Sequence, residues 1–211
     1  MDYRDVLNSK YFVDCYSKIE EMKKDFPVNH GFVHVNNVIN NALRLSKEFK
    51  LRECEERLLL VACALHDIGY LEGRDEHAFN GAILAEKYLK DKGFNGEEIK
   101  IICDAIRNHG GKRISDFEEP VSMCLAISDK LDFVSSRYVK EMLDEEKSKI
   151  FPCILDTCLK NNDKLVLNIY INKDFSVDLF EKSSYYRKLN DFFALVSSVL
   201  NKDYEIKYVL K

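Results

Sequence analysis

The uninterrupted apolar run from Leu58 to Leu65 is the feature that most constrains how this chain can fold. A helix that spans a bilayer needs about 20 apolar residues, so the run predicts a helix buried within the protein instead. It ends directly in His66 and Asp67. An imidazole and a carboxylate are costly to bury, so the end of this helix needs a partner for both groups.

Two explanations fit the His66-Asp67 pair. It could cap the helix and interact with the helix dipole. It could instead bind a divalent metal ion, because neutral imidazole and carboxylate are common ligands of such ions. The dipeptide alone favours the cap, so a choice between the two roles depends on residues elsewhere in the chain.

The pattern along the chain predicts a mostly α-helical protein. Apolar residues recur at helical spacing, and Gly and Pro residues mark the ends of the segments. Gly69 is expected to cap the helix that contains the apolar run. The predicted helices span residues 2–25, 33–50, 53–67, 75–92, 96–109 and 120–135, followed by a charged helix to about residue 149 and a short one from Pro152.

The pattern changes after residue 150. Residues 164–171 and 175–180 alternate in polarity, which predicts two strands joined by a hairpin turn at 172–174. Residues 184–201 read as a helix and residues 204–210 as a last strand. We therefore predict a helical bundle over residues 1–150 and a small α+β (ββαβ) appendage over residues 151–211 that packs on it.

The composition limits the location and partners of the protein. The formal net charge is −4, so no strong nucleic-acid binding is expected. The seven cysteines are odd in number and form no Cys-x-x-Cys motif, which indicates free thiols in a reducing compartment. The N-terminal residues are charged, so we expect no signal peptide, no membrane association and a cytoplasmic location.

Histidines mark the ends of the predicted helices. His34 lies at the start of one helix, His66 at the end of the next, and His77 in the first turn of another. His109 continues an apolar stripe at the end of its helix and should therefore point inward. Asp129 ends a second strongly apolar stretch, where its charge needs a cation.

The ordered set His34, His66-Asp67 and Asp129 resembles the H…HD…D signature of the HD-domain metal-dependent phosphohydrolases, over about residues 28–140. The resemblance implies that these four residues hold a divalent ion, either Mn, Fe, Co, Ni, Zn or Mg. Its bound water would attack phosphorus in a phosphate ester or anhydride, with Asp67 also in a catalytic role. The implied substrate is a nucleotide or another small phosphorylated metabolite. A mixed nitrogen and oxygen ligand set suits such an ion.

The roles of His77 and His109 remain open at this point. Extra histidines bind a second ion in two-metal members of the family, whereas similar residues face the substrate in one-metal members. The two residues are therefore candidates for catalysis, metal binding or substrate binding, and a purely structural role is the third alternative. Lys130 is a further candidate for substrate binding, because it could contact phosphate.

Sequence departures argue against two specialised branches of the family. The segment around His109 lacks the Gly-Tyr-Pro sequence of the cyclic-dinucleotide phosphodiesterases, and no Glu-Asp pair follows Asp67 as in the alarmone hydrolases. We therefore predict a general phosphohydrolase: a phosphatase, phosphodiesterase or pyrophosphohydrolase. The alternative is a non-catalytic, metal-containing regulatory or binding module. The strands of the appendage could also extend a sheet across a homodimer.

Overall fold

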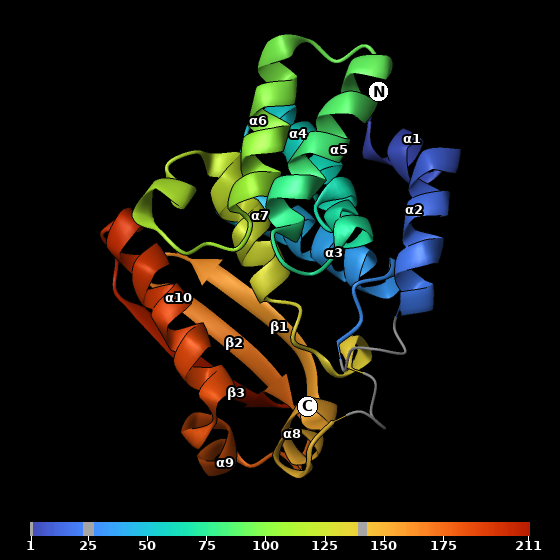
Figure 1. Ribbon diagram of the computed structural model, residues 1–211. Coiled ribbons are helices and arrows are strands. Elements are labelled where there is room, and N and C mark those ends of the chain that lie inside the picture. Colours follow the sequence, from blue (N-terminus) through green and yellow to red (C-terminus); the bar gives the residue numbers. More distant parts are fainter. Residues whose placement is uncertain (1, 23–27, 139–142) are drawn as a thin grey trace.

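The computed structural model describes residues 2–22, 28–138 and 143–211. A body of helices formed by the first part of the chain lies against a small sheet formed by the last part (Figure 1). The helices of the body are α1 (Tyr3–Leu7), α2 (Lys10–Glu21), α3 (Phe32–Glu48), α4 (Glu53–Leu65), α5 (His77–Asp91), α6 (Gly96–Asn108) and α7 (Pro120–Lys130).

Helix α4 forms the centre of the body. Every residue of the apolar run Leu58–Leu65 is buried, as its composition predicts. Helices α3, α6 and α7 pack around α4, and α7 carries a second run of buried residues from Val121 to Ser128. Because their core-facing surfaces are fixed by apolar packing, the ends of these helices hold polar side chains at defined positions.

The N-terminal segment differs from the single helix predicted over residues 2–25. It forms two helices, α1 and α2, because Ser9 caps the second of them: its hydroxyl accepts a hydrogen bond from the Phe12 amide at 3.2 Å. The predicted end of this helix before Pro27 lies outside the described residues.

Gly69 does not cap α4, so that prediction was wrong. Helix α4 ends at Leu65, and Gly69 lies inside a short 3₁₀ helix, Ile68–Glu72. A Cβ atom on Gly69 would lie 1.9 Å from the carbonyl oxygen of His77 and 2.4 Å from the amide nitrogen of Gly81. The glycine therefore permits the start of α5 to approach the end of α4 closely.

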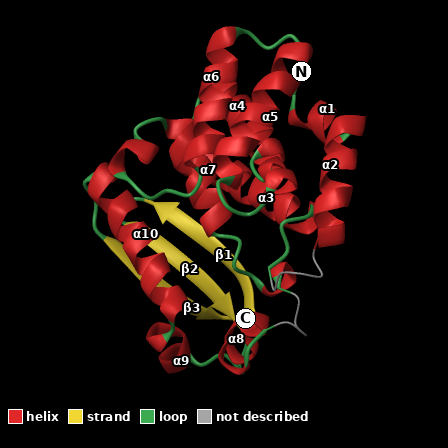
Figure 2. Ribbon diagram, in the orientation of Figure 1, coloured by secondary structure: helices red, strands yellow, loops and turns green. Residues whose placement is uncertain are grey.

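The C-terminal part contains a three-stranded sheet in the order β1-β2-β3 (Figure 2). Strands β1 (Ile154–Asn161) and β2 (Leu165–Ile171) are antiparallel, and β3 (Tyr204–Leu210) runs parallel to β2. Helices α9 (Val177–Lys182) and α10 (Ser184–Leu200) form the crossover, and α10 lies over one face of the sheet (Figure 1). Helix α8 (Glu145–Ile150) precedes the sheet.

Two local predictions for this part were wrong. Residues 175–180 were expected to form a strand after a turn at 172–174, but α9 begins there because the Ser176 hydroxyl accepts a hydrogen bond from the Leu179 amide. The first strand is instead residues 154–161, and the helix expected from Pro152 is one 3₁₀ turn, Phe151–Cys153.

The predicted fold class, a helical HD-type body with a small C-terminal α+β appendage, is confirmed. The division of the chain at residues 150 and 151 stays a prediction. Within the described ranges, none of the helices combines the length and apolar character needed to cross a membrane.

Candidate metal centre

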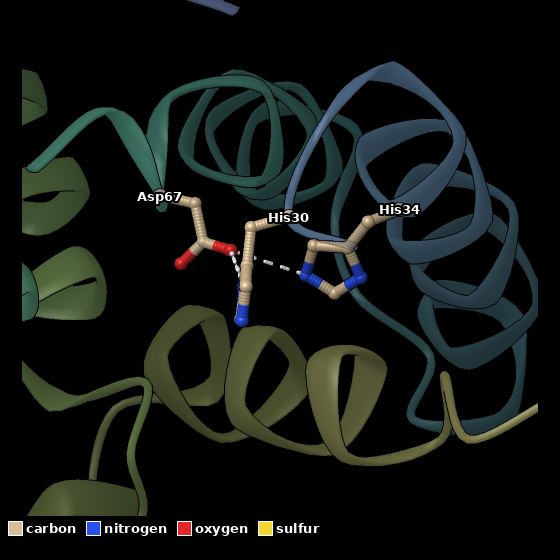
Figure 3. Close-up of side chains that lie close together, drawn as sticks. All are labelled: His30, His34 and Asp67. Carbon is tan, nitrogen blue, oxygen red and sulfur yellow. Dashed lines mark hydrogen bonds and ion pairs between the residues drawn. The ribbon is translucent and has the colours of Figure 1, made fainter. Parts of the chain in front are cut away.

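The ends of α3, α4 and α7 bring together the four residues of the predicted metal set. His34 lies in the first turn of α3, His66 caps the C-terminus of α4, Asp67 follows it, and Asp129 lies in the last turn of α7. His34 and His66 are fully buried, Asp67 is 2% exposed and Asp129 is partly exposed. Figure 3 shows His34 facing Asp67 between these helices.

One atom from each of these four side chains faces a common point. Nε2 of His34 lies 3.1 Å from Nε2 of His66 and 3.3 Å from an oxygen of Asp67 and of Asp129. Nε2 of His66 lies 3.3 Å from the same oxygen of Asp67. Ligand atoms that share an ion at about 2.1 Å lie about 3.0–3.4 Å apart, so the spacing is that of a coordination shell.

The hydrogen bonds behind the two imidazoles determine where their protons lie. Nδ1 of His34 lies 2.6 Å from the Asp132 carboxylate, and Nδ1 of His66 lies 2.8 Å from the Cys63 carbonyl. Carbonyl and carboxylate oxygens only accept, so each Nδ1 donates and the Nε2 atom of each neutral ring carries a lone pair. Two lone pairs and two carboxylate oxygens then converge with no proton between them, an arrangement that fits a divalent cation.

A proton on His34 is the alternative to such a cation. Burial and Arg137 lower the pKa of His34, but hydrogen bonds to Asp129, Asp132 and Asp67 outweigh them and raise it to about 10. Burial raises the pKa values of Asp67 and Asp129, yet their cationic and imidazole neighbours hold both well below the usual range. The carboxylates of Asp67 and Asp129 therefore make the cluster net negative, and this arrangement favours a positive charge at its centre.

A second group of donor atoms lies on the other side of Asp67. Nε2 of His77 lies 3.2 Å from Nε2 of His109, and the second oxygen of Asp67 lies 3.8 and 3.7 Å from these two atoms. Their Nδ1 atoms donate to the backbone carbonyls of Arg74 and Ile106, so lone pairs again face each other. Burial lowers the pKa of His109 to about 4, which keeps this ring neutral at neutral pH.

His30 is a neighbour of the cluster that the sequence analysis did not include. Its Nδ1 lies 2.8 Å from the Asp67 oxygen that also faces His34 (Figure 3). The ring of Tyr70 lies between His30 and His77, with centroids 4.2 and 4.4 Å away and planes inclined by 30° and 28°. The one sequence signal for His30 was its position four residues before His34.

The cations near the cluster differ in their contacts. Arg137 donates to the Asp132 carbonyl at 2.8 Å and lies 3.5 Å from the Asp129 carboxylate. It therefore fixes the position of Asp129, a member of the metal set, and of Asp132, which contacts His34. The Lys130 ammonium lies 5.3 Å from the centre of the Phe192 ring. Arg137 thus supports the cluster directly, whereas Lys130 packs against Phe192 at its border.

Cavities border both groups of donor atoms. One of about 270 Å³ is lined by His30, Tyr70 and Asp129 among others, and another of about 580 Å³ is lined by Tyr70, His77 and His109 among others. Tyr70 lines both, so the two groups of donor atoms are accessible from cavities that meet at this ring.

The fold and the buried His/Asp cluster define a class of protein: a helical domain with a centre suited to a divalent metal ion, as in metal-dependent hydrolases. Residues 31–149, more than half of the chain, match the family model of the HD domain. The chain therefore belongs to the HD domain family, and the resemblance seen in the sequence is confirmed.

Solved structures of other proteins also resemble this chain. A predicted HD superfamily hydrolase from an uncultured Thermotogales bacterium is 21% identical in sequence, with a TM-score of 0.48, over 64% of this chain and 75% of that chain. No curated protein matches the sequence.

Proposed function

We propose that this protein is a metal-dependent phosphohydrolase that cleaves a phosphate ester or anhydride of a nucleotide or another small phosphorylated metabolite. The observation that carries the proposal is the convergence of four donor atoms, from His34, His66, Asp67 and Asp129. Membership of the HD domain family supports hydrolase chemistry at this centre.

The residues around the first site would hold the ion in a fixed geometry. A divalent ion there lowers the pKa of a water ligand and offsets negative charge on a phosphoryl group. Asp132 orients the ring of His34, and the Cys63 carbonyl orients that of His66, so both lone pairs stay directed at the ion. Manganese and other transition ions suit this mixed ligand set.

We further propose that His77, His109 and the second oxygen of Asp67 hold a second ion. A phosphate oxygen would need an N–H group at Nε2 of these rings, but their protons are on Nδ1. The low pKa of His109 also argues against an imidazolium there. A shared carboxylate between two ions supports a two-metal centre over direct phosphate contact by these histidines.

Lys130 is proposed to bind substrate, because it lines the cavity beside Asp129. A cytoplasmic location, the absence of strong nucleic-acid binding and a homodimer through the appendage stay predictions.

The test combines metal analysis with an activity panel. The purified protein is stripped with chelator, reloaded with Mn²⁺, and assayed for metal content and for hydrolysis of an aryl phosphate and of nucleotides. We expect bound metal and metal-dependent release of phosphate. Bound metal without hydrolysis of any compound would favour the non-catalytic module, and full activity in excess chelator would contradict the proposed centre.

A further inference from the structure

The smaller cavity lies between the candidate metal centre and the C-terminal appendage. Asp129 and His30 line it from the centre, and Tyr185 of α10 lines it from the appendage. The helical body and the appendage therefore build this cavity together, and a ligand group in it would lie directly beside a phosphoryl group held at the metal centre.

The charge of the cavity is positive. Arg74, Lys130 and Arg137 line it, whereas Asp129 is the one carboxylate among the lining residues that the structure describes. Arg137 is already engaged with Asp129 and Asp132. Since Asp129 would be neutralised by a bound metal, the wall would keep an excess of cations.

Lys130 is a further cation of this wall, and the described residues give it no carboxylate partner. Its side chain is partly buried, and its ammonium group faces the Phe192 ring. Among the described residues no carboxylate lies within 4.0 Å of it. A partly buried ammonium group loses hydration, and an anionic ligand in the cavity would offset that loss.

The aromatic side chains of the cavity offer little surface for stacking. Tyr70 has both faces covered, by His30 and His77. Tyr138 is stacked on Phe151 with centroids 4.1 Å apart. A flat base would need a free ring face, so these tyrosines contribute mainly hydroxyl groups to a ligand.

Tyr185 is packed differently, among rings that meet it at an angle. Its ring meets Phe151 edge-on with centroids 5.1 Å apart and lies 5.5 Å from the ring of Phe133. Phe133 and Phe151 thus surround part of the ring that the appendage contributes.

We propose that this cavity binds a second oxyanion of the substrate, next to the phosphoryl group that is cleaved. Lys130 supplies the charge, and tyrosine hydroxyls, including that of Tyr185, supply further donors. The substrate is accordingly a compact compound with two anionic groups, such as a diphosphate or a phosphorylated acid. The inference rests on the proposed function, because it assumes that the cleaved group binds at the metal centre.

The test uses three phosphonates that share one group for the metal centre and differ in the second. Methylenediphosphonate carries a second phosphonate, phosphonoacetate a carboxylate, and ethylphosphonate an alkyl group. Their affinities are measured by calorimetry on Mn²⁺-loaded protein freed of excess ion, and by inhibition of aryl phosphate hydrolysis. Metal content is measured after each titration, because a diphosphonate also binds free Mn²⁺.

We expect at least one of the two doubly anionic compounds to bind about tenfold more tightly than ethylphosphonate, the effect of one charge-assisted contact. Lys130→Met should remove that advantage and leave ethylphosphonate within about twofold. Lys130→Arg should retain most of it, and Lys87→Met, an exposed lysine on α5, should change nothing. Tyr185→Phe should weaken the binding of the doubly anionic compound by about fivefold.

The outcomes separate this inference from the proposed function. Equal binding of all three compounds, or an equal loss for all three in Lys130→Met, would overturn the oxyanion site while metal-dependent hydrolysis remained. If Tyr185→Phe bound the doubly anionic compound as tightly as the wild type, the appendage would contribute no donor to the site. Failure of the wild-type protein to hydrolyse any phosphate with metal bound would contradict the proposed function itself. If methylenediphosphonate bound more tightly than phosphonoacetate, the second anionic group of the substrate would be a phosphoryl group. If phosphonoacetate bound more tightly, that group would be a carboxylate.

Discussion

At the scale of single residues, Asp67 connects all the chemistry of the centre. One of its oxygens faces His34, His66 and His30, and the other faces His77 and His109. Asp67 is only 2% exposed, so water does not solvate its charge and neighbouring groups must stabilise it. A carboxylate in this position is expected to bind both proposed ions at once.

Replacement of Asp67 tests this dual role. Asp67→Asn keeps the shape of the side chain but removes its charge, so we expect loss of both ions and a fall in activity of about a thousandfold or more. Elemental analysis and steady-state kinetics measure the two effects, with circular dichroism as a check of the fold. Asp104→Asn, on the outer face of α6, is the control. Retention of either ion in Asp67→Asn would contradict the shared-carboxylate arrangement.

His109→Ala separates the two proposed roles of the second histidine group. If His109 binds the second ion, the variant should hold about one ion fewer per chain than the wild type. If it contacts phosphate instead, the metal content should stay the same while the KM rises. An unchanged metal content with unchanged kinetics would leave only a structural role.

The raised pKa of His34 predicts that metal binding releases a proton. In the metal-free protein its pKa is about 10, so the ring is protonated at neutral pH and an ion must displace that proton. Between about pH 7 and pH 9 the affinity should therefore rise about tenfold per pH unit. Calorimetry in buffers of different ionisation enthalpy measures the released protons. A pH-independent affinity in this range would show that His34 is already neutral.

At the scale of elements, the approach of α5 to the end of α4 depends on Gly69. Gly69→Ala would drive a methyl group into the backbone of His77 and Gly81, and should destabilise the protein by about 1–3 kcal/mol. Because the clash lies at His77, the second ion should be lost before the first. Thermal unfolding and metal analysis measure both effects.

Gly96→Ala is the matched control for this variant, since nothing lies within 4 Å of a Cβ atom there. It should leave the metal content unchanged and alter stability by about 1 kcal/mol or less. If Gly69→Ala behaved like this control, the close approach of α5 would not matter for the centre.

Helix periodicity predicted most elements of the body, because helices such as α3, α5 and α6 bury one apolar side. Gly93 and Gly110 follow closely after the ends of α5 and α6. The sheet was harder to predict. The pairing of β1 with β2 shifts register between Ile154 and Asp156, so the burial along this strand does not alternate regularly. Residues 175–180 alternate in sequence but form α9, because the cap at Ser176 outweighs the alternation.

The same division holds for the candidate site. His34, His66, Asp67 and Asp129 match the ordered signature of the HD family, which implied that they meet, and the structure brings them together. The positions of His30 and Tyr185 depend on contacts between distant segments, which no local pattern encodes. Tertiary packing, and not spacing, puts these two residues beside the centre.

At the scale of the whole molecule, burial should control the reactivity of the cysteines. Of the seven free cysteines, Cys54 is exposed, Cys158 is partly exposed and the rest are buried. Burial raises the pKa of Cys63, Cys124 and Cys158, which disfavours the reactive thiolate. We expect one fast-reacting thiol per native chain in a disulfide-exchange assay, lost in Cys54→Ser. Several fast thiols in the native protein would mean that the core opens readily.

The ring of Tyr70 has a consequence for communication across the molecule. It is held between His30, which borders the smaller cavity, and His77, which borders the larger one. Because both imidazoles stack on Tyr70, tilting either of them would displace the ring that they share. A ligand that tilts one imidazole therefore changes the free energy of placing the other. Thermodynamic reciprocity then requires that a ligand in either cavity changes the affinity for a ligand in the other cavity by the same factor.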